Sequence, residues 1–208
     1  MMNSNHLLSL ASRDALILVD VQNDFLSGGS LAVPDGDQVV AVLNRYIDLF
    51  LKRHLPVFAT RDWHPLNHCS FKNHGGIWPI HCVQHSHGAE FPPKLQLPDD
   101  VEIISKDDTP TMNSYSGFTN SALRQRLHKL GCERLFIGGL ATDYCVLNTV
   151  LDGLKEGFEV ILLEDAIRAV NLNPDDGSHA ITRMKEAGAI GIHVEVLANG
   201  TTSESPTD

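Results

Sequence analysis

Several segments of the chain carry side chains whose types and spacing suit nucleophilic chemistry. Asp20 interrupts the apolar run ALILVDVQNDF, where a carboxylate needs either a partner or a function. Lys106 follows the short apolar segment EIIS, and Cys145 follows the turn GGLATDY. A thiolate is a strong nucleophile, and a neighbouring base or cation favours its formation. The pattern therefore indicates catalysis by Cys145 with an acid and a lysine beside it, and Asp24 competes with Asp20 as the working acid.

Each of these residues also has an ordinary structural explanation. A free cysteine is most often a small buried apolar residue, a carboxylate beside a strand can form a structural ion pair, and a lysine is usually solvated. Cys145 differs from Cys69, Cys82 and Cys132 in its setting, because Thr142 suits a helix N-cap. Unpaired backbone N–H groups at the start of a helix lower the pKa of a thiol, and Lys106 would lower it further.

The histidines are unevenly distributed along the chain. Of 11 histidines, six lie in one stretch: His64, His68, His74, His81, His85 and His87. Asp62 and His64 are two residues apart, so both side chains lie on one side of an extended segment. With His81 as a third ligand and His68 as an alternative, this is the pattern of a catalytic zinc site, and iron or manganese would also fit. The competing interpretation is a polar loop whose histidines form local hydrogen bonds.

The apolar pattern predicts the elements that must position these residues. Strands are expected at 15–21, 55–60, 101–105, 134–137, 159–163 and 189–194, and helices at 38–54, 121–130, 142–156 and 177–187. This alternation predicts an α/β fold, a doubly wound three-layer sandwich with a central, mainly parallel six-stranded sheet and helices on both faces. Ligands of such sheets bind beyond the carboxyl ends of the strands. We therefore expect Asp20, Asp62, Lys106 and Cys145, which follow four different strands, to converge there.

One domain is expected over residues 14–198, after an N-terminal extension at 1–13 and before a disordered tail at 199–208. Residues 62–100 interrupt the alternation and contain five prolines besides the histidine cluster. Because so long a loop within a compact domain is usually functional, this segment is expected to be an irregular metal-binding insertion.

Composition excludes several classes of function. The 208 residues carry a formal net charge of −10, which argues against nucleic acid or a membrane surface as a partner. No apolar run approaches the length of about 20 residues that spans a bilayer, and no basic leader precedes an apolar stretch. Four cysteines without a C-x-x-C pair argue against a disulfide scaffold. The expectation is a cytoplasmic protein with reduced thiols and a small-molecule substrate, with self-association into a homo-oligomer left open.

In its motifs the chain resembles the nicotinamidase/pyrazinamidase branch of the isochorismatase-like cysteine hydrolases. The resemblance runs from about residue 14 to about residue 194. It is carried by ALILVDVQNDFLSGGSLAV (15–33), TRDWHPLNHCSF (60–71), WPIHCV (78–83), Lys106, YSGF (115–118) and GGLATDYCV (138–146). The segments D-V-Q-N-D-F and W-P-x-H-C-V are the parts most specific to nicotinamidases.

The resemblance implies roles for individual residues. It implies a catalytic triad of Asp20, Lys106 and Cys145, and a divalent metal, zinc before iron or manganese, on Asp62, His64 and His81. His68 is a ligand in some members of the family. The backbone N–H groups of Ala141 and Cys145 would form an oxyanion hole beside a cis Leu140–Ala141 peptide bond. The implied substrate contacts are Phe25, Trp78, Tyr115 and Leu140.

The resemblance also implies an activity. This is the hydrolysis of nicotinamide to nicotinate and ammonia through a cysteine thioester, with the metal positioning the pyridine ring, in NAD salvage. Pyrazinamide is the expected second substrate. The main alternative is another amidase of the superfamily, acting on a carbamoyl or ureido substrate, which would need the triad but not the metal ligands. Isochorismatase itself, a non-catalytic binding protein and a hydrolase using metal-bound hydroxide are the remaining alternatives.

Overall fold

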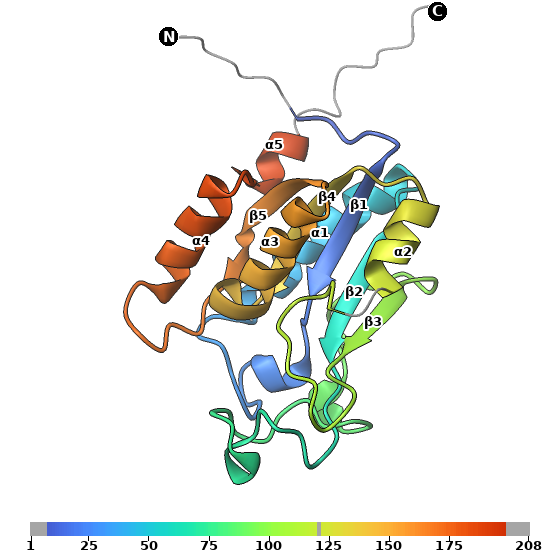
Figure 1. Ribbon diagram of the computed structural model, residues 1–208. Helices are drawn as coiled ribbons and strands as arrows, with labels where there is room; N and C mark the ends of the chain where they lie inside the picture. The colour runs from blue at the N-terminus through green and yellow to red at the C-terminus, as the bar shows by residue number, and fades with distance from the viewer. Residues whose placement is uncertain (1–7, 120–121, 199–208) are drawn as a thin grey trace, which may run out of the picture.

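The computed structural model describes residues 8–119 and 122–198 of the chain (Figure 1). Six strands form one sheet: β1 (Asp14–Val19), β2 (Val57–Asp62), β3 (Glu102–Lys106), β4 (Arg134–Leu140), β5 (Glu159–Arg168) and β6 (Ile190–Ile192). Their order is β3-β2-β1-β4-β5-β6, and every neighbouring pair is parallel. The predicted α/β sandwich is confirmed, with a sheet that is parallel throughout rather than mainly parallel.

Helices cover both faces of this sheet. On one face, in front of the sheet in Figure 1, lie α2 (Ala122–Lys129), α3 (Leu147–Lys155) and α4 (Asp176–Glu186). On the other face, α1 (Gln38–Lys52) packs with α5 (Val194–Ala198). Among the described residues, no helix combines the length and the apolar character that a membrane crossing requires.

The sheet divides the hydrophobic core into two parts. Leu16 and Leu18 of β1 pack toward α1, whereas Ile17 and Val19 pack toward α3, because successive side chains of a strand point to opposite faces. A strand covered on both sides is apolar at nearly every position. This is why β1 is a continuous apolar run that can be recognised in the sequence.

β1 and β4 lie side by side at the centre of the sheet. The strands that follow β1 are added toward one edge, and those that follow β4 are added toward the other. In such a sheet the crevice beyond the carboxyl ends of these two strands is the expected ligand site. Gly139 of β4 makes the close approach possible, because its φ is +126° and a Cβ there would lie 2.1 Å from the carbonyl oxygen of Val19. The long irregular segment after β2 lies beyond the same strand ends, at the bottom of Figure 1.

Several element boundaries differ from the sequence-based expectation. Strand β5 continues to Arg168 although Glu164 and Asp165 end the apolar run on which the shorter prediction depended. The predicted helix at 142–156 begins as a π-helical turn, Thr142–Val146, before α3. Residues 63–100 contain two short 3-10 turns, at Lys72–His74 and His87–Ala89, and no strand or α-helix. The predicted disordered tail at 199–208 and most of the predicted N-terminal extension lie outside the described residues.

Candidate active site

Four polar residues from four strand ends meet at the carboxyl edge of the sheet. Asp20 follows β1 with a left-handed φ of +49°, Asp62 ends β2, Lys106 ends β3, and Cys145 lies in the π-helical turn after β4. All four side chains are buried. The left-handed backbone of Asp20 is a strained conformation of the kind that concentrates at functional sites. The expected convergence of these residues is therefore present.

Lys106 connects the other three residues. Its Nζ lies 2.9 Å from Asp20 Oδ2 and 3.5 Å from Cys145 Sγ, and it donates a hydrogen bond to Asp62 Oδ1. Burial alone would lower the pKa of Lys106, but the carboxylates of Asp20 and Asp62 raise that pKa well above its usual value. The lysine is therefore charged, and it balances the negative charge of the cluster.

The pKa values of the two carboxylates, Asp20 and Asp62, are shifted in opposite directions. Burial raises the pKa of Asp20, against the opposing effect of Lys106. Burial also acts to raise the pKa of Asp62, but the charge of Lys106 and the nearby imidazoles of His64 and His81 hold it well below the usual range. Asp62 therefore remains an anion, whereas Asp20 has the raised proton affinity that a catalytic base needs.

Cys145 does not have the lowered pKa expected from its position at the start of a helix. Burial raises the pKa of the thiol well above its usual value, and the opposing effect of Lys106 is smaller. The resting sulfur is therefore a neutral thiol that needs a base. Asp20 is placed to accept that proton. Thr60 Oγ1 donates to its Oδ1 at 2.7 Å, and its Oδ2, which lies 2.9 Å from Lys106 Nζ, makes no well-aligned hydrogen bond within the described residues.

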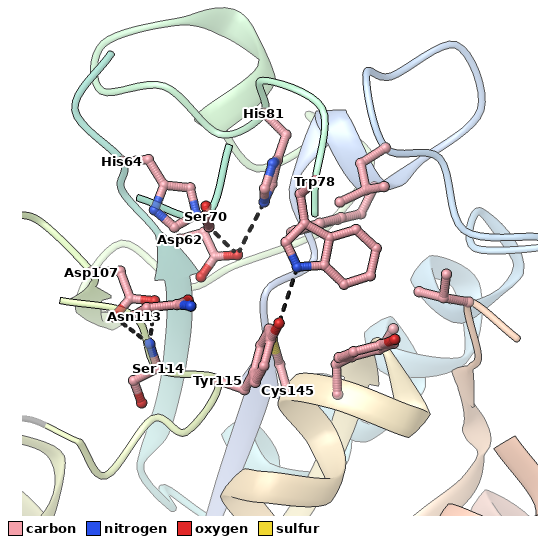
Figure 2. A pocket seen from close by; sticks show the side chains of 15 residues that line it. Asp62, His64, Ser70, Trp78, His81, Asp107, Asn113, Ser114, Tyr115 and Cys145 are labelled. Atoms are coloured by element: carbon pink, nitrogen blue, oxygen red, sulfur yellow. Dashed lines mark hydrogen bonds and ion pairs between the residues drawn. The ribbon is translucent and has the colours of Figure 1, made fainter. Parts of the chain in front are cut away.

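A second group of residues has the geometry of a metal site. Ligand atoms of Asp62, His64 and His81 all lie within 4.8 Å of one another. Asp62 Oδ2 lies 3.6 Å from His64 Nε2 and 3.9 Å from His81 Nε2, and Figure 2 shows the carboxylate between the two rings. Since Oδ1 of the same carboxylate accepts from Lys106, Asp62 joins the metal-type cluster to the catalytic one.

The chemistry of these side chains fits a divalent metal ion. Within the described residues, neither ring nitrogen of the buried His64 has a hydrogen-bond partner, a costly arrangement that a bound cation would relieve. His81 Nδ1 is 2.8 Å from the carbonyl oxygen of Pro79, which leaves Nε2 unprotonated and turned toward Asp62. Burial lowers the pKa of His81 and so favours its neutral form. Two imidazoles and one carboxylate leave an open position in a tetrahedral shell.

His68 lies beside this cluster with both of its ring nitrogens engaged. Its ring stacks on that of His64 with centroids 4.1 Å apart. Its Nδ1 is 2.7 Å from Ser70 Oγ, and its Nε2 is 2.5 Å from the carbonyl oxygen of Met112. A ligand atom of His68 also lies within 4.8 Å of atoms of His64 and Asp107. In this arrangement His68 supports the ring of His64, and its role as a metal ligand stays a prediction.

A cavity joins the thiol to the metal cluster, and aromatic side chains form one wall of it. Trp78 Nε1 donates to Tyr115 Oη at 3.0 Å, and the Trp78 ring meets the Tyr144 ring edge to face, with centroids 5.0 Å apart. Figure 2 shows Cys145 beside Tyr115, with Asp62 beyond it between the two histidines. The cavity is lined by Phe25, Leu31, Asp62, His64, Ser70, Trp78, His81, Asp107, Asn113, Ser114, Tyr115, Ala141, Tyr144, Cys145 and Val170.

The lining agrees with most of the expected substrate contacts but not with all. Phe25, Trp78 and Tyr115 face the cavity, whereas the Leu140 side chain belongs to the hydrophobic core and is not part of the lining. The Leu140–Ala141 peptide bond is cis, and Ala141 lines the cavity. Tyr144 was not identified from the sequence, although its position directly before Cys145 is a signal that could have revealed it.

Comparisons with known proteins agree on one family. Residues 14–196 match the family model described as "Isochorismatase domain". The nicotinamidase of Escherichia coli is 42% identical over an alignment of 196 residues that covers 84% of this chain and 92% of that protein.

Two solved structures are similar in both sequence and fold. The pyrazinamidase of Pyrococcus horikoshii in complex with zinc has a TM-score of 0.83 and 46% identity, covering 87% of this chain and 99% of that one. The PnC1 protein of L. infantum in complex with nicotinate has a TM-score of 0.85 and 38% identity, covering 91% and 98%.

Proposed function

The chain belongs to the isochorismatase-domain family, and we propose that it is a nicotinamidase, an amidohydrolase that converts nicotinamide to nicotinate and ammonia. One observation carries the proposal. Asp62 links the buried Asp20–Lys106–Cys145 cluster to a carboxylate–histidine cluster, and Cys145 and the second cluster line one aromatic-walled cavity. The alternative, an amidase for carbamoyl or ureido substrates, needs the first cluster but has no use for the second.

The first half of the proposed reaction forms a thioester. Asp20 takes the proton of Cys145, and Lys106 stabilises the resulting thiolate. The sulfur attacks the carboxamide carbon, and the N–H groups of Ala141 and Cys145 stabilise the negative charge that forms on the carbonyl oxygen. Asp20 returns its proton to the departing nitrogen, the C–N bond breaks, and ammonia leaves.

The second half hydrolyses the thioester. Asp20, again ionised, takes a proton from a water molecule as the water attacks the thioester carbon. The C–S bond breaks, and Cys145 recovers its proton as nicotinate forms. Asp20 accepts a proton and then gives it up in both halves of the reaction. Its raised pKa therefore bears on both the uptake and the return of the proton.

The remaining residues of the cavity bind and orient the substrate. Phe25 and Trp78 flank the pyridine ring, and Tyr115 holds the Trp78 indole through its hydrogen bond. Asp62, His64 and His81 are the residues that would hold a divalent ion, with zinc as the first candidate because the similar pyrazinamidase structure contains it. A bound ion would supply an electrophile for the pyridine nitrogen and so a template for the ring.

The proposal also includes the substrates, the metabolic role and the location of the protein. The substrate is a small molecule, pyrazinamide is a second substrate, and the reaction feeds nicotinate into NAD salvage. We place the protein in the cytoplasm, which suits its four free cysteines. Self-association remains a prediction from the sequence.

Ammonia release from nicotinamide tests the function directly. We expect release by the metal-loaded protein, and loss of it both after iodoacetamide treatment and after chelation. Release that survives alkylation would move the nucleophile from Cys145 to water. Release from a carbamoyl or ureido amide, with none from nicotinamide, would favour the alternative amidase.

A further inference from the structure

We propose that Gln22 and Asp24 are positioning residues, which hold the metal ligands in a fixed place relative to Asp20. The inference rests on the proposed function only in treating Asp62, His64 and His81 as ligands. Gln22 and Asp24 belong to the segment directly after β1, and neither lines the cavity. Their side chains bond to the backbone of the segments that carry the ligands.

Gln22 binds both backbone groups of Asp62. Its Nε2 donates to the carbonyl oxygen of Asp62 at 2.8 Å, and its Oε1 accepts from the Asp62 N–H at 2.8 Å. The same Nε2 donates to the carbonyl oxygen of Ala89 at 2.9 Å. The side chain is completely buried, so these bonds do not compete with water. Gln22 thus pairs with β2 where β1 itself has ended, and it sets the position of Asp62 relative to Asp20.

Asp24 acts on the two histidines through the backbone of a single residue, Cys82. Its Oδ2 accepts from the Cys82 N–H at 2.7 Å, directly after His81, and its Oδ1 accepts from the Ser30 N–H at 3.1 Å. The carbonyl oxygen of Cys82 accepts from the His64 N–H at 2.9 Å. Cys82 has a left-handed φ of +46°, a conformation that needs support from its surroundings. The carboxylate of Asp24 gives that support and so holds the backbone of both ligands.

Close packing against Gly88 also fixes the position of the Asp24 carboxylate. A Cβ on Gly88 would lie 2.1 Å from Asp24 Oδ2, so the carboxylate rests directly against that glycine. The neighbouring Phe25 ring packs against the His81 ring with centroids 5.7 Å apart. Because both carboxylate oxygens of Asp24 accept backbone N–H groups, the earlier alternative of Asp24 as the working acid has no geometric support.

Zinc affinity of the full chain tests this inference, measured by competition with a chromogenic chelator. We expect Asp24→Asn and Gln22→Glu each to weaken Zn²⁺ binding about 10-fold or more, the usual effect of losing a group that orients a ligand. Nicotinamide turnover by these variants should recover as Zn²⁺ is raised, which a general loss of folding would not allow. Gly88→Ala, which displaces the Asp24 carboxylate without changing it, should weaken Zn²⁺ binding in the same way.

Asp37→Asn is the matched control. Asp37 Oδ2 accepts from the Ser27 N–H at 2.9 Å in the same loop, with no bond to a ligand segment. Its Zn²⁺ affinity should equal that of the unmodified chain. Unchanged affinity in Asp24→Asn and Gly88→Ala would overturn the inference, as would an equal loss in Asp37→Asn or an unmodified chain that binds no Zn²⁺. An unmodified chain that binds Zn²⁺ but releases no ammonia from nicotinamide would overturn the proposed function alone.

Discussion

The charge of Lys106 affects the pKa values of the other buried groups of the candidate site. A buried ammonium group is costly, but two carboxylates within bonding distance keep this one charged. That charge keeps Asp62 ionised and opposes, without overcoming, the effect of burial on Cys145. The resting thiol is therefore neutral, and the proposed reaction begins with proton transfer to Asp20.

Replacement of Cys145 by alanine tests the nucleophile. We expect Cys145→Ala to reduce nicotinamide turnover by roughly 10⁴-fold or more, while Zn²⁺ binding is unchanged because the sulfur lies outside the metal-type cluster. Ammonia release and metal content measure the two effects. Cys132→Ala, another buried cysteine, is the control and should retain both activity and its sensitivity to iodoacetamide. Near-normal turnover by Cys145→Ala would remove the assignment.

Asp20→Asn tests the base. An amide cannot accept a proton from the thiol, so kcat should fall by about 10²–10⁴-fold, the usual contribution of a general base. Asp24→Asn, compared at saturating Zn²⁺, should keep most of its kcat. Steady-state kinetics of the two variants decide between the two carboxylates, and the reverse ranking would return the role of base to Asp24.

At the scale of elements, the site depends on how closely β1 and β4 approach. Gly139 has no Cβ, and its left-handed φ brings the backbone of β4 against Val19 before the chain turns to Cys145. The following turn is π-helical, an arrangement that often marks functional sites. The close approach at Gly139, at the end of the β1–β4 pairing, therefore helps to set the positions of Asp20 and Cys145.

Gly139→Ala should lower both stability and activity. The added Cβ meets the Val19 carbonyl oxygen at 2.1 Å, and alanine is strained at this φ, so we expect a loss of about 2 kcal/mol or more in the free energy of unfolding. Gly138→Ala is the control, since its Cβ would come no closer than 3.2 Å to a neighbouring side chain. Urea unfolding compares the two variants, and equal losses would contradict the importance of the β1–β4 approach.

For the molecule as a whole, the irregular segment after β2 is held both by apolar packing, with Cys82, Ala89 and Leu95 in the hydrophobic core, and by polar contacts. Gln22 and Asp24 bond to it from the segment that follows β1, and the metal-type cluster pairs His81 with Asp62 of the sheet. Within the described part of the chain, the ring nitrogens of the buried His64 have no hydrogen-bond partner. A metal ion bound there would therefore stabilise the fold as well as the site.

Metal removal should lower the melting temperature. A ligand present at 100 times its Kd stabilises the folded state by about 2.7 kcal/mol, which corresponds to roughly 5–10 °C for a domain of this size. Thermal unfolding with Zn²⁺ and with a chelator measures the shift. His64→Ala should abolish it, whereas His85→Ala should keep it, because His85 is exposed in the same segment. A shift that persists in His64→Ala would contradict the assigned ligand set.

Residue type and periodicity along the chain were sufficient to predict the fold class and most of the candidate residues. Strands of a parallel sheet are buried on both faces and must be apolar throughout, so their ends are visible as the first polar residues. Asp20, Asp62 and Lys106 stand at such ends, Cys145 lies in the turn after β4, and parallel strands bring their carboxyl ends to one edge. Local pattern was sufficient for these residues because topology places them together.

How these residues act on one another follows from the three-dimensional packing of the chain. The raised pKa of Cys145, the engaged nitrogens of His68, the place of Tyr144 in the cavity wall and the backbone bonds of Asp24 were not predicted. Each depends on burial or on distances between segments far apart in the chain. Desolvation and hydrogen-bond geometry arise only when those segments pack together. They therefore cannot be predicted from the spacing of residues along the sequence.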